Sequence, residues 1–170
     1  VGLTVQVSTK LNRSHLVTGH EAIILPCLGR TEIDIQSSGE QFVTVENSMG
    51  IVHQSRGGLS PASDELRSEP WIVANLSNIL FDDSPLNWTA LTSNYDHIRD
   101  LMERSLTGFD DYNRRVRQEN GFLLPNPPRD SRTFATPSGK AHFTTHELPN
   151  VSIDKERYVM MTIRSHDQYN

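Results

Sequence analysis

Histidines are the first side chains in this sequence whose spacing could support chemistry. His142 and His146 have the i, i+4 spacing that places two zinc ligands side by side on a helix. The Phe-Thr-Thr between them is instead typical of a strand, where residues four apart lie about 13 Å apart at about 3.3 Å per residue. Two imidazoles at that separation cannot share one ion. We therefore expect a strand over 140–146 with solvent-facing histidines, and no metal site.

A second candidate is the polar cluster over 162–168, which directly follows a predicted buried strand at 158–163. Its Arg164, Ser165 and His166 side chains offer several hydrogen-bond donors at once, as a set of groups that binds phosphate oxygens would. Loops are polar by default, so a solvated loop explains the same composition. From spacing alone we favour the solvated loop.

The glycine pattern argues against a phosphate-binding loop, and the single cysteine excludes an internal disulfide and an iron-sulfur cluster held by this chain alone. The sequence has neither G-x-G-x-x-G nor G-x-x-x-x-G-K-[ST], so Gly57-Gly58 is predicted to be a flexible turn. Cys27 cannot form an internal disulfide, nor can it hold an iron-sulfur cluster within this chain alone. The simplest location for such a chain is a reducing compartment, and we expect the cytoplasm.

Composition and charge limit the kinds of partner that this chain could bind. The chain has 170 residues, a net charge of −5, and no basic block of the kind that nucleic-acid binders carry. It also has no apolar run near the roughly 20 residues that a membrane helix needs. We expect neither nucleic acid nor membrane as a partner.

Strands dominate the first third of the chain. Strand patterns occur at 3–7, 22–26 and 41–46, and the continuous apolar run Ile23–Leu25 indicates a strand buried on both faces, as in a parallel sheet covered by helices. The chain opens directly into a strand without an initiator Met, and the strand at 158–163 has no evident partner. We therefore expect a fragment whose unpaired edges bind the rest of a parent polypeptide or another copy, as a homo-oligomer.

Helices dominate the middle. Ser68 is a suitable N-cap for a helix with Glu69 and Pro70 in its first turn. A second helix is predicted from Ser84 to Leu106, with a break near Thr92, and a short third one over 109–116. Four prolines between 122 and 137 indicate an ordered connector near a domain boundary.

Six sequence blocks, in order along nearly the whole chain, resemble the formate-dehydrogenase-like molybdopterin oxidoreductases. They are Glu21–Pro26 (EAIILP), Thr44–Gly50 (TVENSMG), Pro61–Ser63 (PAS), Ser68–Ala74 (SEPWIVA), Pro137–Ala141 (PSGKA) and the most distinctive one, Met161–Asn170 (MTIRSHDQYN). Members of this family bind two molybdopterin guanine dinucleotides around one molybdenum or tungsten atom.

The resemblance implies an α/β fold in three parts. Residues 1–84 would be the late part of a Rossmann-like cofactor-binding domain, and 85–150 a helical segment with a Pro-rich connector. Residues 151–170 would be the start of a C-terminal double-psi β-barrel, of which 158–163 is the first strand, and which also binds the dinucleotide.

The resemblance also implies roles for individual residues. Ser8 and Thr9 match a polar pair that follows a strand and touches the dinucleotide, and ligands of open α/β sheets do bind beyond the carboxyl ends of strands. Glu69 matches an acidic position before a Trp that pairs with guanine. Its alternative role is a charge at a helix N-terminus, stabilising by about 0.3–1 kcal/mol. Thr162, with the Arg164, Ser165 and His166 named above, matches the strand exit that wraps the pterin and phosphates.

This sequence departs from the family pattern at one position, and it has no counterpart for several other family residues. A basic residue that some relatives place after the Leu-Pro strand falls near Ile33 here. The metal ligand, the active-site His and Arg and any cluster cysteines belong to earlier parts of the family's chain. We therefore expect no catalytic residue here, no cofactor bound to the isolated chain, and no turnover by it.

The sequence thus predicts a fragment of a molybdopterin oxidoreductase that contributes to binding of molybdopterin guanine dinucleotide. Its main partner would be the rest of the parent polypeptide; the redox partner is not indicated. The alternative is a non-catalytic binding or assembly module that keeps the scaffold only. A zinc hydrolase, the third class, requires clustered histidines.

Overall fold

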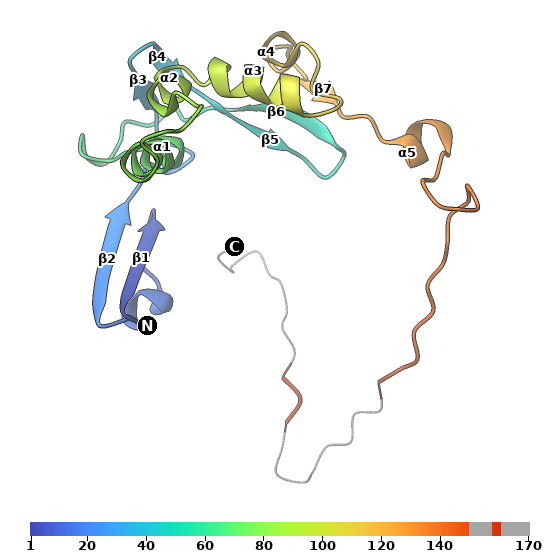
Figure 1. Cartoon of the computed structure of the whole chain (residues 1–170), viewed down its shortest axis with the longest axis horizontal. Coiled ribbons are helices and arrows are strands. Elements are labelled where there is room, and N and C mark those ends of the chain that lie inside the picture. Colours follow the sequence, from blue (N-terminus) through green and yellow to red (C-terminus); the bar gives the residue numbers. More distant parts are fainter. Residues whose placement is uncertain (150–157, 161–170) are drawn as a thin grey trace. The chain divides into compact units, whose positions relative to one another are not determined.

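The computed structural model describes residues 1–149 and 158–160 (Figure 1). The chain divides into two compact units, Val1–Asn126 and Pro127–Asn170. The division falls inside the proline-rich segment at 122–137. No helix in the described residues is long and apolar enough to cross a membrane.

A parallel pair of strands opens the first unit. β1 (Leu3–Ser8) pairs with β2 (Glu21–Pro26) in a register that sets Leu3 opposite Glu21 and Ser8 opposite Pro26. The crossover between them contains a short 3-10 helix, η1 (Arg13–Leu16), whose first N–H groups are capped by the side chain of Asn12. The strand predictions for these two segments are confirmed.

The predicted burial of the second strand is wrong for this chain. Ile23, Ile24 and Leu25 keep between 38% and 46% of their surface exposed. A strand is buried on both faces only where helices or another sheet pack on them, and the exposure of these side chains shows that no such cover is complete in the described part of the chain.

Two antiparallel sheets follow. β3 (Asp34–Gln36) and β4 (Gly39–Gln41) form a hairpin, and β5 (Val43–Glu46), β6 (Ile51–Ser55) and β7 (Phe122–Leu123) form a sheet in that order. The single strand predicted at 41–46 is therefore divided at Phe42. Gln41 pairs with Asp34 in the hairpin, whereas Val43 pairs with Ser55 in the larger sheet.

The helical middle agrees with the sequence patterns. α1 (Glu69–Leu80) starts after Ser68, whose side chain accepts a hydrogen bond from the Trp71 N–H, as predicted for an N-cap. The long second helix is broken as expected, into α2 (Trp88–Ser93) and α3 (Asp96–Ser105), and α4 (Tyr112–Arg115) is the short third one. α2 begins later than Ser84 because Asn87 is its N-cap.

The core of the first unit joins the three-stranded sheet to α4. Its buried members are Phe42, Val52, Tyr112, Val116 and Phe122. Tyr112 and Phe122 pack edge to face with ring centroids 5.5 Å apart, a favoured geometry for aromatic pairs.

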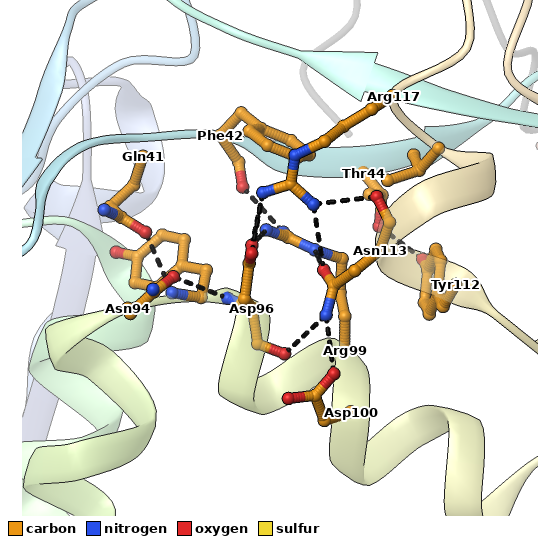
Figure 2. A network of polar contacts seen from close by, with 12 residues as sticks. Gln41, Phe42, Thr44, Asn94, Asp96, Arg99, Asp100, Tyr112, Asn113 and Arg117 are labelled. Atoms are coloured by element: carbon orange, nitrogen blue, oxygen red, sulfur yellow. Dashed lines mark hydrogen bonds and ion pairs between the residues drawn. The ribbon is translucent and has the colours of Figure 1, made fainter.

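An ionic network around the buried Arg99 lies beside this core (Figure 2). The guanidinium of Arg99 stacks over the Phe42 ring at 4.0 Å and donates hydrogen bonds to the Phe42 carbonyl, to Asn113 and to Asp96. Arg117 donates two hydrogen bonds of 2.7 Å to the same Asp96 carboxylate. These contacts connect α3 to Phe42, which precedes β5, and to Asn113 and Arg117, in and after α4.

The described part of the second unit has little regular structure. It contains α5 (Pro127–Ser131), followed by irregular chain to residue 149. The strand predicted at 140–146 is therefore wrong; a strand needs a neighbour for its backbone groups, and no described segment pairs with these residues. Tyr158–Met160 form no strand either, and the rest of the strand predicted at 158–163 lies outside the described residues.

Candidate functional site

The carboxyl ends of β1 and β2 meet the start of α1. The Cys27 N–H donates to the Ser8 carbonyl at 3.2 Å, which continues the parallel ladder past β2. Cys27 also forms a parallel bridge with Arg67, and the Leu28 N–H donates to the Arg67 carbonyl at 3.0 Å. The two residues that follow Arg67 are the N-cap Ser68 and Glu69, the first residue of α1.

This arrangement brings three of the predicted site residues into one region. Ser8 ends β1 and donates its hydroxyl hydrogen to the Lys10 carbonyl at 2.7 Å. The Thr9 methyl lies 4.0 Å from the point where a Cβ on Gly29 would lie, and Gly29 lines the same cavity as Glu69. The other four predicted residues, Thr162, Arg164, Ser165 and His166, lie outside the described residues.

The cavity beside Glu69 measures about 100 Å³. Its charged and amide lining residues are Arg30, Glu32, Asp34, Gln41 and Glu69. Small-molecule sites typically enclose about 300–1,000 Å³, so this cavity fits one end of a larger ligand, such as a single ring system.

Glu32 fixes the loops that form the cavity. Its two carboxylate oxygens accept hydrogen bonds from the backbone N–H groups of Gly29 at 2.6 Å and Ala62 at 2.8 Å. Gly57 packs so closely on this segment that a Cβ there would lie 1.9 Å from the Glu32 carbonyl oxygen. The prediction that Gly57-Gly58 is only a flexible turn is therefore wrong, because Gly57 is required for close backbone packing.

A buried polar network supports the start of α1 from the other side. The Tyr95 hydroxyl contacts Asp34 and the N-cap Ser68, and Gln36 donates to Asp34 at 2.6 Å. Burial and then the hydrogen bond to Asp34 raise the pKa of Tyr95. The phenol therefore stays protonated and acts as a donor.

Cys27 has the properties of a structural thiol. Its side chain is 4% exposed, and burial, followed by the negative charge of Glu69, raises its pKa above the ordinary value. A protonated, buried thiol is a poor nucleophile and a poor metal ligand. Within the described residues no group of three or more His, Cys, Asp or Glu side chains could hold a metal ion.

Sequence reasoning missed two residues of this region. Arg30 lines the cavity four residues after Pro26, whereas the basic position of the family was placed at Ile33. A charged residue in the loop after a predicted parallel strand was the available signal. Tyr95 lies within the segment 84–106 that the sequence predicts to be helical, and nothing in its spacing indicates that Asp34 is its partner.

Comparison with known proteins finds relatives that are much longer than this chain. The chain is 52% identical over 169 residues to the uncharacterized oxidoreductase Rv2900c of Mycobacterium tuberculosis and to the uncharacterized oxidoreductase Mb2924c of Mycobacterium bovis. It is 48% identical over 172 residues to the protein YdeP of Escherichia coli. Each match covers 99% of this chain but only 22% of the relative.

The chain is thus homologous to a segment of much larger proteins, two of which are named oxidoreductases. No family model matches it, and no solved structure matches it.

Proposed function

We propose that this chain is part of a molybdopterin-dependent oxidoreductase of the formate-dehydrogenase-like kind, and that it helps to bind molybdopterin guanine dinucleotide. The observation that carries the proposal is that two parallel strands end beside a helix start, with Ser8 and Thr9 at the end of β1 and Glu69 at the start of α1 lining a cavity there. Ligands of open α/β sheets bind at such a place. The names of the long mycobacterial relatives support the reaction class.

In this proposal each residue has a binding role. The Ser8 hydroxyl would exchange its hydrogen bond to the Lys10 carbonyl for one to a phosphate oxygen, and the Thr9 hydroxyl would contact the phosphates as well. The Glu69 carboxylate would accept from the N–H groups of guanine. Thr162, Arg164, Ser165 and His166 would contact the pterin and phosphates, on the strength of the family resemblance alone. The metal centre of the bound cofactor supplies the two-electron chemistry, and this chain supplies binding and orientation.

Two further proposals concern the larger protein: its fold, and the main partner of this chain within it. The Rossmann-like domain and the double-psi barrel are proposed as the fold of the larger protein, with the rest of its polypeptide as the main partner. The exposed apolar side chains of β2 are consistent with such a partner. The cytoplasmic location indicated by the single cysteine stays a prediction.

The test is the nucleotide content of a full-length protein that contains this chain. Glu69→Gln removes the charge that accepts from guanine, and Glu21→Gln is the matched control because Glu21 begins β2, at the opposite end of that strand. We expect guanine nucleotide, released by acid and measured by chromatography, in the wild type and in Glu21→Gln. Glu69→Gln should weaken retention about tenfold, as the loss of one charged hydrogen bond predicts.

Two results would contradict the proposal: no guanine nucleotide in the wild-type full-length protein, or equal retention in both variants. Retention of the dinucleotide without any redox activity would favour the binding or assembly module instead.

A further inference from the structure

Among the charged side chains that line the cavity beside α1, some already have hydrogen-bond partners and others have none. Both carboxylate oxygens of Glu32 accept backbone N–H groups, and both oxygens of Asp34 accept from Gln36 and Tyr95. By contrast, neither the Arg30 nor the Glu69 side chain makes a hydrogen bond or an ion pair with any residue of the described part of the chain. The cavity therefore has one available cation and one available anion.

These two groups lie on the same cavity without pairing with each other. An ion pair would bring their nitrogen and oxygen atoms within 4.0 Å, and none is formed. A ligand that satisfies both must present hydrogen-bond acceptors to Arg30 and donors to Glu69.

The backbone that carries each group is fixed. Arg30 lies in a turn closed by the Glu32 N–H, which donates to the Gly29 carbonyl at 3.0 Å, and by the contact of Glu32 with the Gly29 N–H. Glu69 follows Ser68, which is buried and held by Tyr95 at 2.6 Å. Fixed backbones reduce the entropy lost when the two side chains close on a ligand.

Guanine presents the required groups on one ring system. Its O6 and N7 are acceptors that an arginine fork can bind together, and its N1–H and 2-amino groups are donors that suit a carboxylate. Adenine has a donor in place of O6, so it would set an N–H group against the guanidinium. A cavity of about 100 Å³ suits a single base.

We propose that Arg30 is a specificity-determining residue that, together with Glu69, selects guanine among the nucleobases in this cavity. The inference rests on the proposed function, because it assumes that the base end of a nucleotide enters the cavity, but it assigns a contact that the family resemblance does not.

The experiment titrates the full-length protein, produced without its cofactor, with guanosine monophosphate and two analogues, and measures the heat of binding by calorimetry. The 7-deazaguanosine monophosphate analogue lacks only N7, and inosine monophosphate lacks only the 2-amino group. The wild type should bind both analogues about five- to a hundredfold more weakly than guanosine monophosphate.

Arg30→Ala should weaken binding of guanosine monophosphate about tenfold and abolish the discrimination against 7-deazaguanosine monophosphate, while the discrimination against inosine monophosphate persists through Glu69. Arg30→Lys should recover part of the affinity, because a lysine acts as a point charge without the fork. Arg104→Ala, on α3 and away from the cavity lining, is the matched control and should bind like the wild type.

Equal binding of all three nucleotides by the wild type, unchanged discrimination in Arg30→Ala, or no binding would each overturn the role of Arg30. Failure of the proposed function is distinguished by the separate nucleotide assay on the full-length protein. A full-length protein that retains guanine nucleotide while Arg30→Ala changes nothing would leave the function standing and remove only this contact.

Discussion

The Tyr95 hydroxyl donates a 2.5 Å hydrogen bond to Oδ2 of Asp34, 61 residues earlier in the sequence. The same hydroxyl lies 2.6 Å from Ser68 Oγ, so one buried phenol joins the β3–β4 hairpin, the start of α1 and the start of α3. The hairpin and the start of α1 contribute to the cavity walls through Asp34, Gln41, Ser68 and Glu69. The relationship therefore connects the stability of the unit to the shape of the site.

Tyr95→Phe removes this hydroxyl and keeps the ring. Asp34 then loses a buried donor, and we expect the free energy of unfolding to fall by about 1–3 kcal/mol. Urea denaturation followed by circular dichroism measures the change. Tyr158→Phe is the matched control, because Tyr158 is 97% exposed and should shift the midpoint very little. Equal effects of the two substitutions would show that the Tyr95 hydroxyl contributes nothing specific.

Asp96 is expected to make stability depend on acid pH. Burial alone would raise its pKa, but hydrogen bonds and charges from Arg117 and Arg99 outweigh this and hold the pKa below its ordinary value (Figure 2). An aspartate with a lowered folded pKa contributes stability above its unfolded pKa of about 3.9, and this contribution is lost as the pH falls through the folded value.

Asp96→Asn should therefore destabilise the chain by about 2–4 kcal/mol at pH 7, because Arg99 stays buried without its carboxylate. The difference from the wild type should shrink as the pH is lowered from 5 toward about 3. Unfolding free energies of both proteins across this range test it, with Asp82→Asn, beyond the end of α1, as the control. A wild-type advantage that does not change with pH would rule out Asp96 as the titrating group.

Substitutions at the neighbouring glycines Gly57 and Gly58 test the close backbone packing, with Gly58 as the matched control. A Cβ on Gly57 would lie 1.9 Å from the Glu32 carbonyl oxygen, whereas one on Gly58 would meet nothing within 4 Å. Gly57→Ala should cost at least about 2 kcal/mol through forced movement of backbone, and Gly58→Ala should stay within about 0.5 kcal/mol of the wild type. Thermal unfolding compares them, and a tolerated Gly57→Ala would mean that the two loops separate easily.

Sequence reasoning succeeded where local preferences act alone. The Ser68 cap, the start of α1 and the break between α2 and α3 follow from side chains within one or two helical turns of the feature they determine. β1 and β2 were recognisable from their alternation and apolar run. The same reasoning failed at 140–146, where strand composition met no pairing partner among the described residues.

The sequence by itself determined the helices and strands with strong local signals, the absence of a phosphate loop, and the resemblance from which Ser8, Thr9 and Glu69 were drawn. Only the tertiary structure decided that Ser8, Thr9 and Glu69 share one region, that Arg30 and Glu69 line one cavity unpaired, and that Tyr95 binds Asp34. The reason is that these contacts join residues roughly 40 to 60 positions apart, and which of them form depends on how whole elements pack, a choice that no short stretch of chain encodes.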